Sequence, residues 1–188
     1  MALRVAFFGT PGFAVPTLEL LVQSPHQVAG VVTQPDRPRG RGQQVTEAPV
    51  KALASSLGLT VLQPERLARD GFETAFTALG ADIGVVAAYG KILPDWLLNS
   101  PRLGLINVHA SLLPKYRGAS PVHRAVIAGD AETGVTIMRV VKALEIGVTR
   151  GECDQADAAF VAGGEQVGGE RGTDGPDEHD VGGQHVEA

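Results

Sequence analysis

Short apolar runs bounded by turn residues recur along the first 141 residues, and they most constrain how this chain can fold. A run such as Ile83–Ala88 (IGVVAA) is apolar at every position, as expected of a strand buried on both faces. Segments with helical spacing lie between the runs, among them Phe13–Gln23 and Pro121–Ala128. This alternation predicts an α/β fold, a Rossmann-like and mostly parallel sheet with helices on both faces.

The other expected elements follow the same pattern. Further strands are predicted at Leu3–Gly9, Val28–Thr33, Thr60–Gln63, Gly104–His109 and Gly134–Val141. Helices are predicted at Pro49–Leu57 and at Glu65–Leu79, the latter interrupted near Gly71, and Gln34–Gln44 is predicted to be a polar loop. Ligands of such sheets bind beyond the carboxyl ends of the strands, so the turns after Gly9, Ala88 and His109 are the places to look for chemistry.

The first of these turns, Gly9–Phe13 (GTPGF), does not carry a known nucleotide signature. A dinucleotide fingerprint requires G-x-G-x-x-G, and a phosphate-binding loop requires Gly-Lys followed by Ser or Thr. Here Pro11 occupies a position where a backbone N–H would be needed. The sequence therefore disfavours NAD or ATP binding at this turn, which is otherwise a tight connection from strand to helix.

The stretch LINVHASLLPKYRG (residues 105–118) carries the strongest chemical signal. Asn107, His109 and Ser111 are spaced two residues apart, and on a strand this spacing sends all three side chains to one face. An amide that donates to a developing oxyanion and an imidazole that shuttles a proton suit acyl transfer. A hydrogen-bonded pair at a strand end is the alternative. The apolar step that follows could line a pocket for a flat ligand or pack on the core.

A second candidate site is the loop QPDRPRGRG (residues 34–42). It holds Arg37, Arg39 and Arg41 together with two prolines and two glycines. Three arginines in such a loop suggest contacts to phosphates, and a solvated loop is the alternative.

Charge and cysteine content point to a cytoplasmic protein with two unlike segments. Residues 1–150 carry 15 Lys and Arg against 11 Asp and Glu, whereas residues 151–188 carry one Arg against 10 acidic residues. Cys153 is the only cysteine, so no intrachain disulfide can form. The sequence shows no signal peptide, no apolar run long enough for a membrane span, and no convincing metal-ligand spacing.

The acidic end of the chain does not follow the strand and helix pattern. Residues 151–188 contain no Leu, Ile, Trp or Tyr, so we expect residues 149–188 to be disordered. Most of these residues are Gly, Ala, Val, Asp or Glu, whose codons all begin with G, which suggests a shifted reading frame that begins near Glu145. A natural acidic tail is the alternative.

Five stretches in this order resemble the methionyl-tRNA formyltransferase family: residues 7–18 (FFGTPGFAVPTL), 31–42 (VVTQPDRPRGRG), 85–94 (VVAAYGKILP), 105–130 and 132–144. The resemblance implies 10-formyltetrahydrofolate as formyl donor, initiator methionyl-tRNA as acceptor, catalysis by Asn107 and His109, and no metal. It also implies that Arg37, Arg39 and Arg41 contact the tRNA. The pterin would lie in a cleft formed by Tyr89, Gly90, Lys91, Ile92, Leu93, Ser111, Leu112, Leu113 and Pro114.

The chain also departs from the family pattern. The family has a catalytic Asp where this chain has Glu145, which we expect to be its counterpart. We expect residues 1–148 to form a monomeric formyltransferase domain incomplete at its end, the family's C-terminal tRNA-binding domain to be absent, and activity to be impaired. The rivals are another folate-dependent N-formyltransferase, acting on an amino sugar or a purine precursor, and an inactive folate- or tRNA-binding fragment.

Overall fold

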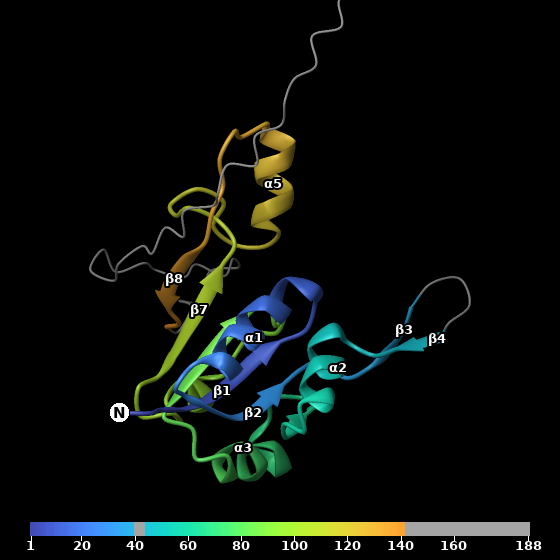
Figure 1. The fold of residues 1–188 in the computed structure, drawn as a ribbon, viewed down its shortest axis with the longest axis vertical. Coiled ribbons are helices and arrows are strands. Elements are labelled where there is room, and N and C mark those ends of the chain that lie inside the picture. The colour runs from blue at the N-terminus through green and yellow to red at the C-terminus, as the bar shows by residue number, and fades with distance from the viewer. Residues whose placement is uncertain (40–43, 142–188) are drawn as a thin grey trace, which may run out of the picture.

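A six-stranded sheet forms the centre of the protein (Figure 1). The computed structural model describes residues 1–39 and 44–141, so the predictions for residues 142–188 lie outside the described residues. The strand order is β5-β2-β1-β6-β7-β8. The strands are β1 (Arg4–Gly9), β2 (Gln27–Val32), β5 (Val61–Leu62), β6 (Ile83–Ala87), β7 (Leu105–His109) and β8 (Thr136–Arg139).

The strand order reverses between β1 and β6. From β1 the chain adds β2 and then β5 on one side, and from β6 it adds β7 and then β8 on the other. The first five strands are parallel, and β8 pairs antiparallel with β7. A crevice opens at the carboxyl edge of a parallel sheet where its strand order reverses, so the ends of β1 and β6 mark the expected ligand position.

Helices cover both faces of the sheet, as the sequence predicts. On one face, α1 (Val15–Gln23) and α2 (Pro49–Ser56) bury Leu18 and Val50 against β1 and β2. On the other face, a π-helical turn η2 (Arg69–Glu73), α3 (Thr74–Ala78) and α4 (Asp95–Leu98) bury an aromatic cluster. There Phe8 and Phe76 lie with ring centroids 5.6 Å apart. The remaining helical elements are the 3-10 turn η1 (Gly12–Ala14) and α5 (Pro121–Ala128).

Most predicted elements agree with the structure, and three differ. The expected polar loop contains a hairpin, in which β3 (Arg37–Arg39) pairs antiparallel with β4 (Gln44–Thr46). The helix predicted from Glu65 begins only at Arg69, and it starts with the π-helical turn that contains Gly71 at a φ of 77°. The short helix α4 was not predicted, because four residues carry too little periodicity. In the described ranges, no helix is long and apolar enough to cross a membrane.

Close packing between β6 and β7 gives a stability prediction at Gly84. A Cβ added at Gly84 would lie 2.7 Å from Leu105 Cγ, a distance that requires the core to shift. We expect Gly84→Ala to lower the free energy of unfolding by about 1–3 kcal/mol, measured by urea denaturation. Gly12→Ala is the control, because a Cβ there meets nothing within 4 Å. Equal stabilities of the two variants would contradict this account.

Candidate functional site

Asn107 and His109 lie at the carboxyl end of β7 and share one face of the sheet. Leu105 belongs to the cluster under α3, whereas Ile106 and Val108 pack against the cluster under α1 and α2. Side chains alternate along a strand, so Asn107 and His109 lie on the α3 face with Leu105. Both are partly buried, and Asn107 is flanked by Val86 of β6 and Met138 of β8.

The orientation of the His109 ring is fixed by a backbone carbonyl. His109 Nε2 lies 3.1 Å from the carbonyl oxygen of Tyr116. A carbonyl oxygen can only accept a hydrogen bond, so Nε2 carries the proton and donates it. In the neutral ring, Nδ1 is then the basic nitrogen, able to accept a proton from a substrate.

Ser111 does not share the face of Asn107 and His109 in the way the spacing predicts, because β7 ends at His109. The chain turns there, and the Ser111 N–H donates to the His109 carbonyl at 2.9 Å. Ser111 is fully buried, and its hydroxyl donates to the Lys115 carbonyl at 2.7 Å. Its own carbonyl accepts from Thr136 Oγ1 at 2.7 Å. Ser111 therefore holds the bend, and its part in folate binding stays a prediction.

Of the other residues in the predicted folate bend, Leu112 and Leu113 are partly buried and Pro114 is exposed. Leu112 packs so closely on Gly134 that a Cβ there would lie 2.6 Å from Leu112 Cδ2. The Leu113 N–H donates to Thr136 Oγ1 at 3.1 Å, and the peptide bond from Leu113 to Pro114 is cis. Pro114 is exposed, so the bend offers its apolar tip to solvent.

The stretch predicted to form the other wall, residues 89–93, follows β6. The Tyr89 ring is 2% exposed and stacks edge-on against Phe8, with ring centroids 5.6 Å apart. The ring is part of the core, and the role of Tyr89 in folate binding stays a prediction. Burial raises the pKa of the Tyr89 hydroxyl to about 12.

The other members of this stretch are nearer the surface. Gly90 is exposed with a φ of 80°, and Ile92 is 79% exposed, whereas Leu93 packs partly against the core. Lys91 Nζ donates to the carbonyls of Pro64 and Glu65 at 2.8 and 2.9 Å, and desolvation lowers the pKa of this ammonium group. Lys91 thereby joins the loop after β6 to the loop after β5.

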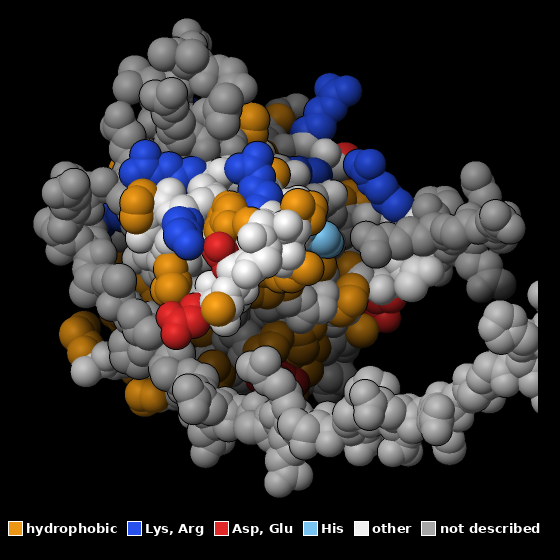
Figure 2. Space-filling view, turned by 90° about the horizontal axis from the view of Figure 1, so that it is seen from above, with side chains coloured by type: hydrophobic (Ala, Val, Ile, Leu, Met, Phe, Trp, Pro, Cys, Tyr) orange, Lys and Arg blue, Asp and Glu red, His pale blue; other side chains and the backbone are white. Residues whose placement is uncertain are grey.

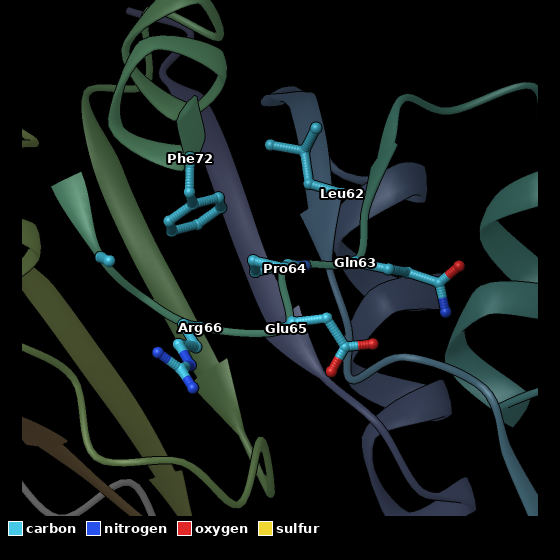
Figure 3. A pocket seen from close by; sticks show the side chains of 7 residues that line it. Leu62, Gln63, Pro64, Glu65, Arg66 and Phe72 are labelled. Carbon is cyan, nitrogen blue, oxygen red and sulfur yellow. The ribbon is translucent and has the colours of Figure 1, made fainter. Parts of the chain in front are cut away.

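A pocket of about 470 Å³ lies beside Lys91, at the end of β5 (Figure 3). The Leu62 and Phe72 side chains lie on either side of Pro64 in this view, and Glu65 and Arg66 lie below it. Its lining shares no residue with the predicted folate site. The lining residues are Leu62, Gln63, Pro64, Glu65, Arg66, Ala68 and Phe72.

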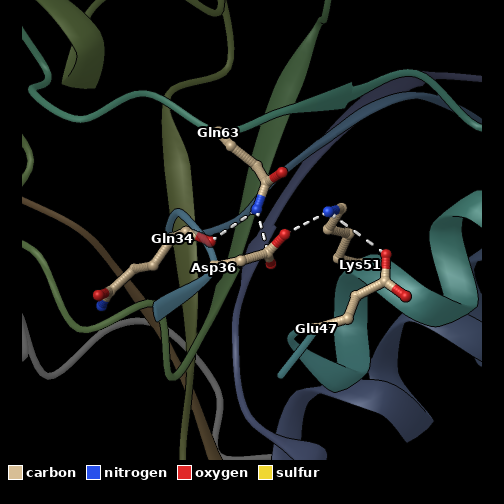
Figure 4. Close-up of polar contacts among 5 residues, drawn as sticks. All are labelled: Gln34, Asp36, Glu47, Lys51 and Gln63. Carbon is tan, nitrogen blue, oxygen red and sulfur yellow. Dashed lines mark hydrogen bonds and ion pairs between the residues drawn. The ribbon is translucent and has the colours of Figure 1, made fainter. Parts of the chain in front are cut away.

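Polar side chains that the sequence reading missed connect the loops at this edge. Gln34 Nε2 donates to the Tyr89 carbonyl at 2.7 Å, and Thr10 Oγ1 donates to the same oxygen at 3.3 Å. Gln63 Nε2 donates to the Gln34 carbonyl at 3.0 Å and to Asp36 Oδ1 at 3.1 Å (Figure 4). All of these side chains come shortly after the end of a strand, and this position in the sequence could have indicated that they lie at the ligand-binding edge.

Lys51 of α2 binds both ends of the β3–β4 hairpin. Its ammonium group pairs with Asp36 before the hairpin and, at 3.4 Å, with Glu47 after it (Figure 4). The hydrogen bond from Lys51 holds the pKa of Asp36 below its ordinary value, and the same bond raises the pKa of Lys51. The hairpin is therefore fixed at its base.

The predicted arginines are only partly described. Arg37 begins β3 with an exposed side chain, and Arg39 ends β3. Arg41 and Glu145 lie outside the described residues. In Figure 2, Lys and Arg side chains gather over the upper part of the face, with hydrophobic side chains between them. In the described part of the chain, no three His, Cys, Asp or Glu side chains group in a way that could hold a metal ion.

Comparison with known proteins decides the family. A sequence model described as formyl transferase matches residues 3–149. The chain belongs to the formyl transferase family. The family resemblance carried by the five stretches is therefore confirmed.

Relatives in this family carry one recurring name. The methionyl-tRNA formyltransferase of Acidiphilium cryptum is 55% identical over 148 residues, and that of Methylobacillus flagellatus is 53% identical over 145 residues. These alignments cover 78% and 77% of this chain, but 49% and 47% of the relatives. The chain thus spans about half the length of the relatives it matches.

Solved structures of the formyl transferase family share the fold. Glycinamide ribonucleotide transformylase 1 from Geobacillus kaustophilus superposes with a TM-score of 0.60 and 23% identity, over 80% of this chain and 81% of that one. Phosphoribosylglycinamide formyltransferase from Anaplasma phagocytophilum gives a TM-score of 0.61 and 23% identity, over 79% and 70%. The predicted Rossmann-like formyltransferase fold is confirmed.

The base of the hairpin gives a pH-dependent prediction. Because the folded-state pKa of Asp36 is lowered, its carboxylate stabilises the fold above the unfolded value of about 3.9, and this contribution is lost as the pH falls through the folded value. We expect Asp36→Asn to lower stability at pH 7 by about 1 kcal/mol or less. In thermal melts, its deficit against the parent should shrink on acidification. Glu19→Gln, at an exposed helix position, should show no such trend.

Proposed function

We propose that this chain transfers a formyl group from 10-formyltetrahydrofolate to the α-amine of methionyl-tRNA. The observation that carries the proposal is the pair Asn107 and His109, which end one strand on one face of the sheet. They lie within the part of the chain that matches the family. The relatives named methionyl-tRNA formyltransferase, at 51–55% identity, favour this acceptor over a sugar or a purine precursor.

The chemistry follows from the two side chains. The neutral α-amine attacks the formyl carbon, a C–N bond forms, and the carbonyl oxygen becomes an oxyanion. The Asn107 amide donates a hydrogen bond to that oxygen. His109 Nδ1 takes the proton that the amine loses. It returns this proton to the folate nitrogen as the oxyanion collapses and the bond between that nitrogen and the formyl carbon breaks. We propose that Glu145 supplies the carboxylate that the family pattern places beside this pair.

For the folate, we propose a site between the exposed ends of the two loops. Gly90 and Ile92 would face the pterin from the loop after β6, and Leu113 and Pro114 from the bend after β7. Lys91 and Leu93 would support the first loop, whereas Ser111 and Leu112 would support the second. Tyr89 would contribute through its anchored backbone.

For the tRNA, we propose that the hairpin supplies the contacts. Arg37, Arg39 and Arg41 belong to one short segment whose ends Lys51 binds. Guanidinium groups on a hairpin with a fixed base suit the phosphates of an acceptor stem. The acceptor would be initiator methionyl-tRNA, which places the protein in one-carbon metabolism, translation initiation and the cytoplasm. We propose that the chain acts as a monomer.

The first test is formyl transfer under single-turnover conditions, with the chain in excess over methionyl-tRNA. We expect slow formation of formyl-methionyl-tRNA and a loss of about 100- to 1,000-fold in rate for Asn107→Ala, because an oxyanion donor is removed. Glycinamide ribonucleotide and an amino-sugar nucleotide serve as competing amines. Faster formylation of either would sink the proposal. Folate binding without transfer to any amine would favour the fragment alternative instead.

The second test concerns the hairpin and measures the salt dependence of tRNA binding. Each phosphate contact contributes about one to the slope of log affinity against log salt. We expect Arg37→Ala to reduce that slope by about one, whereas Arg69→Ala, an exposed site on η2, leaves it unchanged. An unchanged slope for Arg37→Ala would remove this residue from the proposed interface.

A further inference from the structure

Three successive backbone carbonyls after the folate bend each accept a hydrogen bond from a side chain. The Lys115 carbonyl accepts from Ser111 Oγ at 2.7 Å, and the Tyr116 carbonyl from His109 Nε2 at 3.1 Å. The Arg117 carbonyl accepts from Arg124 Nη1 at 3.3 Å. Residues 115–117, here called the platform, are thus held in place by side chains, and His109 is hydrogen-bonded to the middle residue of the three.

Tyr116 adopts a backbone conformation that is unfavourable without support from the surrounding structure. Its φ of 54° lies in the left-handed region, which bulky L residues rarely adopt. Such a residue persists where the surrounding structure fixes it, often next to a functional group. The platform therefore needs an anchor outside its own backbone.

Asp130 is that anchor. The Tyr116 hydroxyl donates to Asp130 Oδ2 at 2.8 Å, and Lys115 Nζ lies 3.3 Å from the same oxygen. Asp130 follows the left-handed Gly129 that ends α5, and its N–H donates to the Ala125 carbonyl at 3.0 Å. The hydrogen bond between the two side chains raises the pKa of Tyr116 and lowers that of Asp130, as expected for a phenol that donates to a carboxylate.

We infer that Tyr116 and Asp130 are positioning residues for His109. Asp130 holds the Tyr116 side chain, the Tyr116 carbonyl holds the proton on His109 Nε2, and Nδ1 is thereby kept as the basic nitrogen. The inference deepens the proposed function, since it rests on His109 as the proton carrier. Neither positioning residue has to touch the substrate.

The tautomer of His109 gives a test that does not depend on activity. Long-range ¹H–¹⁵N spectra of the full chain, with ¹⁵N-labelled histidine, report which ring nitrogen carries the proton. The spectra are recorded at alkaline pH, because only a neutral imidazole ring has two distinct tautomers. His109→Gln identifies the signal among the five histidines. We expect the parent to show the Nε2–H form.

The variants separate positioning from a general structural role. In Tyr116→Phe and Asp130→Ala the anchor is lost, and we expect a mixture of the two tautomers. Asp130→Asn keeps an oxygen that accepts from the tyrosine, so it should retain the parent form. Glu132→Gln removes an exposed carboxylate two residues away and should change nothing. A parent-like His109 signal in both Tyr116→Phe and Asp130→Ala would overturn the inference, whatever their stability. If one of them does not fold, the other decides.

A kinetic measurement links the tautomer to the proposed reaction. We expect Tyr116→Phe to lower kcat by up to about 100-fold with an unchanged KM for methionyl-tRNA, because the ring is misoriented and tRNA contacts remain. A changed tautomer with unchanged kcat would argue against His109 as proton carrier, yet leave its positioning by Asp130 intact. The two hypotheses therefore fail in different ways.

Discussion

The Tyr89 carbonyl is the contact on which the carboxyl edge of the sheet depends. The Tyr89 ring packs in the aromatic core against Phe8, so the core determines where the Tyr89 carbonyl oxygen lies. The oxygen accepts hydrogen bonds from Gln34 and Thr10, which follow β2 and β1. Three loops that leave neighbouring strands are thus tied to one atom of the core. The strand order reverses at this edge, so these loops border the position where a ligand is expected.

The elements of the sheet could be predicted because burial on both faces leaves a simple signal. Short, largely apolar runs bounded by turn residues located all six strands, and Pro121–Ala128 was located with its observed bounds. The hairpin formed by β3 and β4 could not be predicted. Its arginine and proline residues have no alternation of apolar and polar side chains, and its pairing depends on the opposite strand. The delayed start of the helix at Arg69 was likewise set by tertiary packing, because Phe72 is drawn into the core.

The candidate site could be predicted only where local geometry decides it. Asn107 and His109 share a face because strand alternation holds along β7. Alternation fails for Ser111, which lies beyond the last paired residue and turns into the bend. Tyr116 and Asp130 could not be paired from sequence, since nothing in the spacing indicates that a loop and a helix end would meet. The burial of Tyr89 likewise depends on its neighbours in space.

Lys51 separates the β3–β4 hairpin from the rest of the domain, because it pairs with a residue on each side of the hairpin. Because one lysine of α2 grips Asp36 and Glu47, the residues between them start and finish at almost the same point in space. We expect such a segment to tolerate changes of length or charge, because its two ends are held at one place on the surface of the sheet domain. Under the proposal that the hairpin contacts the acceptor, exchange of this one segment would change the acceptor while Asn107 and His109 keep their places at the end of β7.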